Sequence, residues 1–297
     1  MVCEYEKGMV PMKDSAAWAE CRKACSACPH GCSPALGKLG LCRARRGGAE
    51  GVIPESYGRI TSIALDPIEK KPISRWRPRT TVLSLGGYGC NMSCPFCQND
   101  FIAQAGPDDI GWRQVEPAAI VEEALALKGR RCIGIAYTYN EPLVFWEFVR
   151  DTARMAHDAG LVNVLVSNGM ATREVLEELA PLIDAANIDL KCFTDEGYRK
   201  LGGNLGAVKR TIEMLAGTST CHLEVTTLVV PGLSDDDAQM DDMARWLASV
   251  DPGIPYHLTR FFPRYRMSDA QPTPISTLRR MAGIAERHLD DVMLGNI

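Results

Sequence analysis

Short apolar segments alternate with amphipathic segments from about residue 80 to the end of the chain. This alternation predicts strands that each lead into a helix, as in a parallel α/β sheet. The expected strands span residues 81–85, 132–137, 161–166, 186–190, 222–230 and 256–261. The expected helices span residues 117–128, 142–159, 173–182, 207–216, 236–249 and 275–288. Because these units are fewer than the eight that close a complete barrel, we predict a partial (β/α)6 TIM-like barrel.

The first 79 residues lack this alternation and are rich in glycine, proline and basic residues. Cysteines lie close together here, at positions 21, 25, 28, 32 and 42. Prolines interrupt any regular element between residues 66 and 79. We expect residues 1–79 to form a small, irregular, cysteine-rich lobe with a connection, and residues 80–297 to form the main domain.

Composition limits the partners and the cellular compartment that the protein is expected to have. A chain of 297 residues with 46% hydrophobic residues can bury a large core, and a net charge of -4 argues against a nucleic-acid partner. No apolar run approaches the roughly 20 residues that cross a bilayer, and residues 1–13 are too polar for a secretory signal. We therefore expect a soluble, cytoplasmic protein without a membrane partner. In that compartment thiols stay reduced, so the 12 cysteines favour metal ligation over disulfides.

Cys90, Cys94 and Cys97 follow the first predicted strand in a glycine-rich C-x3-C-x2-C loop. Thiolates are the ligands of iron–sulfur clusters, and three of them leave one iron of a [4Fe-4S] cluster open. The open iron can bind the amine and carboxylate of S-adenosylmethionine (SAM) and pass an electron to its sulfonium. The alternatives are a structural zinc loop or unrelated thiols, but zinc usually takes four ligands and no fourth lies nearby in sequence. We predict a [4Fe-4S] cluster and SAM here, on the C-terminal face of the barrel.

This loop, with Phe96 before its last cysteine, resembles the radical SAM superfamily from about residue 80 onward. The resemblance implies that Phe96 lies against the adenine of SAM; otherwise it is a core residue. Residues 137–142, Tyr-Thr-Tyr-Asn-Glu-Pro, stand where many members have Gly-Gly-Glu-Pro. By the same resemblance, Glu141 accepts hydrogen bonds from the SAM ammonium, and Asn140 replaces backbone contacts. The local alternative is an N-cap that opens the next helix at Pro142.

The later strand ends resemble the glycyl-radical-activating branch, exemplified by pyruvate formate-lyase activating enzyme. The branch's Asp-Leu-Lys pattern falls on residues 189–191. It implies that Lys191 meets the SAM carboxylate, while Asp189 and Ser167 or Asn168 contact the cofactor or a bound cation. Val166 stands where that enzyme has an aspartate, which argues against the cation. The alternative for Asp189 and Lys191 is a salt-bridged strand end.

The chain as a whole resembles the AmmeMemoRadiSam group of radical SAM enzymes, notably at residues 28–32, 37–42 and 66–72. The resemblance implies an oxidoreductase that splits SAM into methionine and a 5'-deoxyadenosyl radical, which takes hydrogen from a protein or peptide. The implied electron donor is a flavodoxin or ferredoxin. The alternatives are a radical SAM methyltransferase or small-molecule-modifying enzyme, and a non-catalytic iron–sulfur protein.

The cysteine-rich segment of the N-terminal lobe, residues 21–42, is called the leader. It supplies four more thiols, in the pattern Cys25-x2-Cys28-x3-Cys32-x9-Cys42, with Cys21 left over. Four ligands are the number needed for a closed zinc site or a fully ligated second cluster. His30 offers zinc a substitute ligand. The alternative is free thiols in a flexible arm, and the spacing does not choose between zinc and iron–sulfur.

Overall fold

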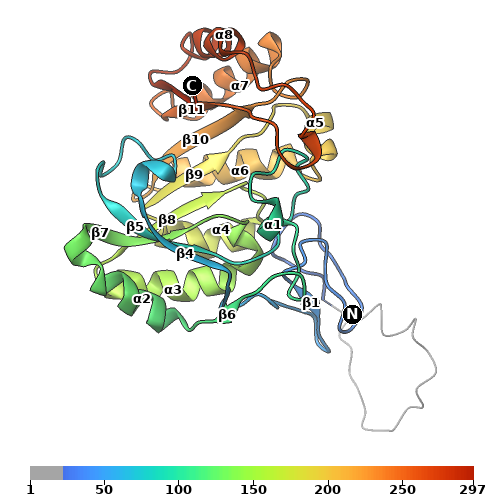
Figure 1. Ribbon diagram of the computed structural model, residues 1–297, viewed down its shortest axis with the longest axis vertical. Coiled ribbons are helices and arrows are strands. Elements are labelled where there is room, and N and C mark those ends of the chain that lie inside the picture. The colour runs from blue at the N-terminus through green and yellow to red at the C-terminus, as the bar shows by residue number, and fades with distance from the viewer. Residues whose placement is uncertain (1–22) are drawn as a thin grey trace.

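The computed structural model describes residues 23–297, so Cys21 and the segment before it lie outside the described residues. An eight-stranded sheet in the order β12-β11-β10-β9-β8-β7-β5-β4 runs through the molecule (Figure 1). Its pairs are parallel except at one edge, where β4 runs antiparallel to β5. The strands are β4 (Ser62–Pro67), β5 (Thr81–Gly86), β7 (Cys132–Tyr137), β8 (Val162–Ser167), β9 (Ala185–Asp189), β10 (His222–Val229), β11 (Tyr256–Arg260) and β12 (Val292–Gly295).

Helices connect the parallel strands, as the alternating pattern predicted (Figure 1). The α-helices are α1 (Asp100–Ala103), α2 (Pro117–Ala126), α3 (Trp146–Asp158), α4 (Arg173–Leu179), α5 (Asp195–Lys200), α6 (Leu205–Ala216), α7 (Asp237–Val250) and α8 (Ile275–Ala285). Short 3-10 helices are η1 (Ile68–Lys70), η2 (Lys128–Arg130), η3 (Pro142–Phe145), η4 (Ala180–Leu182) and η5 (Tyr265–Met267). None of the helices in the described part of the chain is long and apolar enough to cross a membrane.

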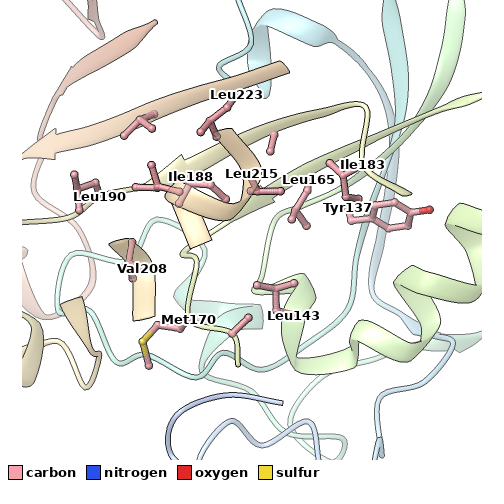
Figure 2. Close-up of a cluster of buried hydrophobic side chains, with 14 of the residues drawn as sticks. Tyr137, Leu143, Leu165, Met170, Ile183, Ile188, Leu190, Val208, Leu215 and Leu223 are labelled. Atoms are coloured by element: carbon pink, nitrogen blue, oxygen red, sulfur yellow. The ribbon is translucent and has the colours of Figure 1, made fainter. Parts of the chain in front are cut away.

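The core lies on both faces of the sheet, because successive side chains of a strand point to opposite faces. Leu165 belongs to a large cluster shared with the helices, part of which Figure 2 shows. Its neighbour Val164 belongs to a smaller cluster on the other face. Ile68 and Ile73, from the connection before β5, complete that smaller cluster. The central strands are therefore buried on both sides, which explains their nearly continuous apolar sequences.

The α/β prediction is confirmed, and each of the six predicted strands matches an observed strand to within one residue at either end. The structure adds an edge strand on each side, β4 and β12, that the pattern did not predict. Both are half-exposed, and β4 carries Asp66 and ends at Pro67, so neither has the apolar run of a central strand. The division of the chain at residue 80 stays a prediction, although β4, which precedes it, pairs along its whole length with β5.

Apart from β4, the described part of the N-terminal lobe contains only two-residue strands. β1 (Arg46–Gly47) pairs with β2 (Val52–Ile53), and β3 (Arg59–Ile60) pairs with β6 (Arg113–Gln114). An ion pair between Arg45 and Glu147 of α3 (2.6 Å) fixes the lobe to the main domain. The lobe, drawn in blue in Figure 1, therefore lies beside the loops that follow the sheet's first strands.

Candidate active site

Chemistry-bearing residues gather where the parallel strands end. The cysteine loop follows β5, Glu141 follows β7, Asn168 follows β8, and Lys191 follows β9. Since these strands are neighbours and parallel, their carboxyl ends lie along one edge of the sheet. This is the edge at which open and closed α/β sheets place their sites.

The cysteine loop is packed tightly against the lobe. Gly89 has a φ of +83°, and a Cβ there would lie 2.3 Å from the Cys42 carbonyl oxygen, so this position requires glycine. The Cys97 N–H donates to the Cys94 carbonyl (3.2 Å), which closes a turn around Phe96. Phe96 itself is buried and belongs to the core, so its contact with an adenine stays a prediction.

The three thiols are free, Cys94 is buried, and Cys90 and Cys97 are partly buried. Burial raises the pKa of Cys90 well above its ordinary value and that of Cys94 to about 11, although the charge of Lys191 acts to lower the latter. No group of three or more Cys, His, Asp or Glu within residues 23–297 converges on a single metal ion. A [4Fe-4S] cluster makes no such demand, because each thiolate binds a different iron. Three free thiols on one loop beside a lysine therefore fit that cluster better than one zinc ion.

A pair of asparagines supports the loop. Asn168 donates from Nδ2 to Asn91 Oδ1 (2.9 Å) and lies 3.6 Å from Cys90 Sγ. Asn91 in turn donates to the Met170 carbonyl (2.8 Å). Sequence reasoning did not select Asn91, because its partners lie more than 70 residues away in the chain. Its one local signal is a polar residue between two cysteines of the loop.

Glu141 is buried, with 2% of its surface exposed, and its carboxylate joins two strand ends. It accepts hydrogen bonds from Leu143 N (3.0 Å), Ser167 Oγ (2.8 Å) and Asn168 N (2.8 Å). The bond from Leu143 is the N-cap of η3, so the local alternative foreseen for this residue is present. Burial raises the pKa of Glu141 to about 7, against the opposing effect of these hydrogen bonds. The contacts of Glu141, Ser167 and Asn168 with SAM stay predictions.

Tyr139 and Asn140 stand in place of two glycines, next to the backbone that leads into the cysteine loop. Tyr139 has a φ of +72°, a conformation that glycine adopts without strain. Its hydroxyl donates to Asp66 Oδ2 (2.6 Å). Asn140 accepts from Gly87 N (2.9 Å) and donates to the Gly89 carbonyl (3.0 Å), so its side chain makes contacts with the loop backbone.

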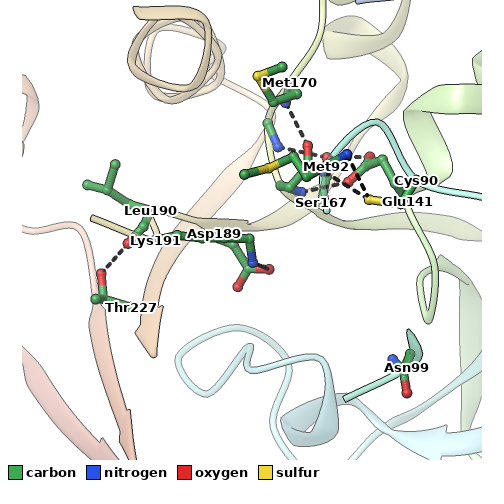
Figure 3. Close-up of polar contacts among 12 residues, drawn as sticks. Cys90, Met92, Asn99, Glu141, Ser167, Met170, Asp189, Leu190, Lys191 and Thr227 are labelled. Carbon is green, nitrogen blue, oxygen red and sulfur yellow. Dashed lines mark hydrogen bonds and ion pairs between the residues drawn. The ribbon is translucent and has the colours of Figure 1, made fainter. Parts of the chain in front are cut away.

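Asp189 and Lys191 form an ion pair at the end of β9, with 3.0 Å between Oδ2 and Nζ (Figure 3). Burial acts to lower the pKa of Lys191, but the charges of Asp189 and Cys94 outweigh it and raise this pKa. The Lys191 N–H donates to Tyr198 Oη (3.1 Å), which fixes the backbone here. The salt bridge foreseen as the alternative is thus present. It uses one of the three ammonium donors of Lys191 and leaves two for a ligand.

The leader cysteines also meet in space. Cys25, Cys28, Cys32 and Cys42 line one small cavity, together with residues that include Asn91. The structure thus places this second set of thiols beside the first.

Comparison with known proteins decides the family. The model of the radical SAM superfamily matches residues 85–247, a range that includes the cysteine loop and the strand ends described above. This chain belongs to the radical SAM superfamily. The family relies on a [4Fe-4S] cluster and SAM, so the prediction of a radical SAM enzyme is confirmed.

Relatives of this radical SAM chain include an activating enzyme. Protein MJ0808 of Methanocaldococcus jannaschii, which is uncharacterized, is 38% identical over 278 residues, covering 92% of this chain and 81% of that protein. The pyruvate formate-lyase 1-activating enzyme of Escherichia coli (strain K12) is 27% identical over 223 residues, covering 69% of this chain and 88% of the enzyme. A solved radical SAM methyltransferase from Sphaerobacter thermophilus has a TM-score of 0.54 and 16% identity, covering 74% of this chain and 67% of that one. The last match shows a shared fold alone, whereas the second makes this chain a distant relative of pyruvate formate-lyase activating enzymes.

Proposed function

We propose that this protein is an activase-like radical SAM oxidoreductase of the AmmeMemoRadiSam group that abstracts hydrogen from a protein or peptide. The observation that carries the proposal is the position of three free thiols beside the Asp189–Lys191 pair, at one edge of the sheet. The distant likeness to pyruvate formate-lyase 1-activating enzyme favours a protein substrate. A flavodoxin or ferredoxin would supply the electron.

The residues divide into ligands, SAM contacts and supports. Cys90, Cys94 and Cys97 would hold the cluster. When bound, the cluster and SAM supply methionine and a 5'-deoxyadenosyl radical, the species that takes hydrogen from the substrate. Lys191 would bind the SAM carboxylate through its free ammonium donors, and Phe96 would lie against the adenine.

Glu141, Ser167, Asn168 and Asn140 surround the loop and set its position. Glu141 presents a buried carboxylate that already accepts three hydrogen bonds, so any ammonium contact must use a remaining lone pair. Together these residues would hold the thiols in place and exclude water from the site. This matters because a carbon radical must react with the substrate before it reacts with solvent or with other side chains.

The test is an anaerobic reaction of the reconstituted protein with SAM, a reductant and candidate protein substrates. We expect 5'-deoxyadenosine and a new glycyl radical in the electron paramagnetic resonance (EPR) spectrum of the substrate protein. A methylated product with S-adenosylhomocysteine would assign the chain to the methyltransferase alternative. Absence of SAM binding would assign it to non-catalytic iron–sulfur proteins.

A further inference from the structure

The leader cysteines form a separate, preformed cluster of thiols around one cavity. Cys25, Cys28, Cys32 and Cys42 all line one small cavity. The backbone is folded around it, since the Cys25 N–H donates to the Cys32 carbonyl (2.8 Å) and the Gly31 N–H to the Cys28 carbonyl (3.2 Å). All four thiols are free. Residues far apart in the leader thus converge on one enclosed space.

The lobe has little else to hold it in this shape. Its buried apolar residues between positions 23 and 50 are Ala27, Cys28, Cys42 and Ala44. Two alanines and two cysteines cannot supply the core that a fold of this length needs, and small domains of this kind are usually stabilised by a bound metal. The convergence of the thiols is therefore best explained by a metal centre.

A buried arginine gives an independent sign that something occupies the cavity. Arg45 lines it and has 5% of its surface exposed. Its terminal nitrogens bind Glu147, but its Nε–H has no hydrogen-bond partner among the described residues. A buried donor without a partner is costly, so an acceptor is expected beside it. The sulfurs of an iron–sulfur cluster accept hydrogen bonds of this kind.

The geometry favours a cluster over zinc. Thiolates lie about 2.3 Å from a zinc ion, so a closed zinc site would bring all four sulfurs around one point. In residues 23–297 no such convergence on a single ion occurs. His30, the substitute zinc ligand, lies with its Nε2 2.8 Å from the Asn91 carbonyl oxygen and so is engaged with the neighbouring loop.

We propose that Cys25, Cys28, Cys32 and Cys42 hold a second, fully ligated [4Fe-4S] cluster that relays electrons to the cluster of the Cys90 loop. The relay rests on the radical SAM function proposed above; the second cluster itself does not. The two ligand sets are joined directly, because the Cys90 N–H donates to the Cys42 carbonyl (3.2 Å). Leu41, next to Cys42, lines the same cavity and is 65% exposed, so this site lies near the protein surface, where a donor protein can approach it.

One electron travels from the donor protein to SAM through both clusters. A reduced flavodoxin or ferredoxin gives up one electron, and the leader cluster is reduced by that electron. The leader cluster then passes the electron to the cluster of the Cys90 loop and returns to its oxidised state. There the electron breaks the bond between the SAM sulfur and C5', leaving methionine and the deoxyadenosyl radical. With no open iron, the leader cluster exchanges electrons but binds no substrate.

The experiment compares full-length proteins reconstituted anaerobically with iron and sulfide: the wild type, a loop variant (C90A/C94A/C97A), a leader variant (C28A/C32A) and the control Cys221→Ala, whose thiol lies in neither set. We expect about eight irons in the wild type and the control and about four in each multiple variant. On reduction, the loop variant should show a cluster EPR signal that SAM does not change. The leader variant should show one that SAM does change.

Different failures have different meanings. A loop variant that contains no iron, or one zinc, would overturn the second cluster, and this holds even if the leader variant does not fold. A loop variant with four irons beside a leader variant whose signal ignores SAM would overturn the proposed function and leave the second cluster standing. For the relay, the leader variant should lose SAM cleavage with reduced flavodoxin, and titanium(III) citrate should restore it. Equal cleavage with flavodoxin by wild type and leader variant would refute the relay.

Discussion

Replacing Lys191 by methionine tests the contact that separates a SAM-binding strand end from a plain salt bridge. Methionine keeps the length and apolar stem of lysine and removes its charge. In the structure, Lys191 Nζ donates one hydrogen bond to Asp189 Oδ2 (3.0 Å), and 17% of the Lys191 side chain is exposed. The two remaining donors can therefore reach a ligand carboxylate, and the variant removes them without removing a cluster ligand.

The size of the effect follows from the kind of bond. A hydrogen bond to a charged group contributes about 1.5–3 kcal/mol, and about 1.4 kcal/mol changes a dissociation constant tenfold. Lys191→Met should therefore weaken SAM binding by about 10- to 100-fold. The loss of the ion pair itself adds little to this, because the Asp189 side chain is 37% exposed and water can solvate it.

The assay is isothermal titration of SAM into reconstituted protein under argon, with iron content measured on the same samples. The matched control is Lys200→Met, which removes an exposed lysine from its ion pair with Glu196 (2.8 Å) on α5. We expect unchanged iron in both variants and unchanged affinity in the control. Equal SAM affinity in Lys191→Met and wild type would show that Lys191 serves the salt bridge alone.

Two buried glutamates should give opposite pH dependences of stability, measured by urea unfolding of the cluster-free protein. The pKa of Glu141 is raised from 4.5 to about 7, so wild type should lose about 3 kcal/mol relative to Glu141→Gln as the pH rises through this range. Glu224 accepts bonds from His222, His257 and two backbone N–H groups, which outweigh its burial and lower its pKa to about 2. Wild type should therefore lose about 3 kcal/mol relative to Glu224→Gln as the pH falls from 4.5 towards 2. A difference between wild type and variant that stays constant with pH would contradict either prediction.

The fold was readable from the sequence wherever a strand is buried on both faces. Segments such as Cys132–Tyr137 are short, apolar and followed by a helix, so local pattern and tertiary position agree. The edge strands β4 and β12 escaped prediction because each is covered on one side only, and what defines them is pairing with a strand elsewhere in the chain.

The site was readable only as far as its residues lie in local motifs. The cysteine loop was found by spacing, residues 189–191 by their resemblance to the activating branch, and the N-cap role of Glu141 was foreseen from Asn-Glu-Pro. The contacts of His30 and Asn91 were not, because they join segments 61 or more residues apart and leave no local pattern. The choice between zinc and a cluster likewise depends on how far apart the leader thiols lie, which spacing along the chain does not reveal.

The central claim is that Cys90, Cys94 and Cys97 hold the cluster that cleaves SAM. Its most direct test is the amount of 5'-deoxyadenosine formed from SAM and dithionite, under argon, by wild type, Cys94→Ala and the control Cys221→Ala. If each loop cysteine binds its own iron, the loop has no spare thiol to replace one, so the account predicts product from wild type and control and none from Cys94→Ala. Wild-type amounts of 5'-deoxyadenosine from Cys94→Ala would contradict it.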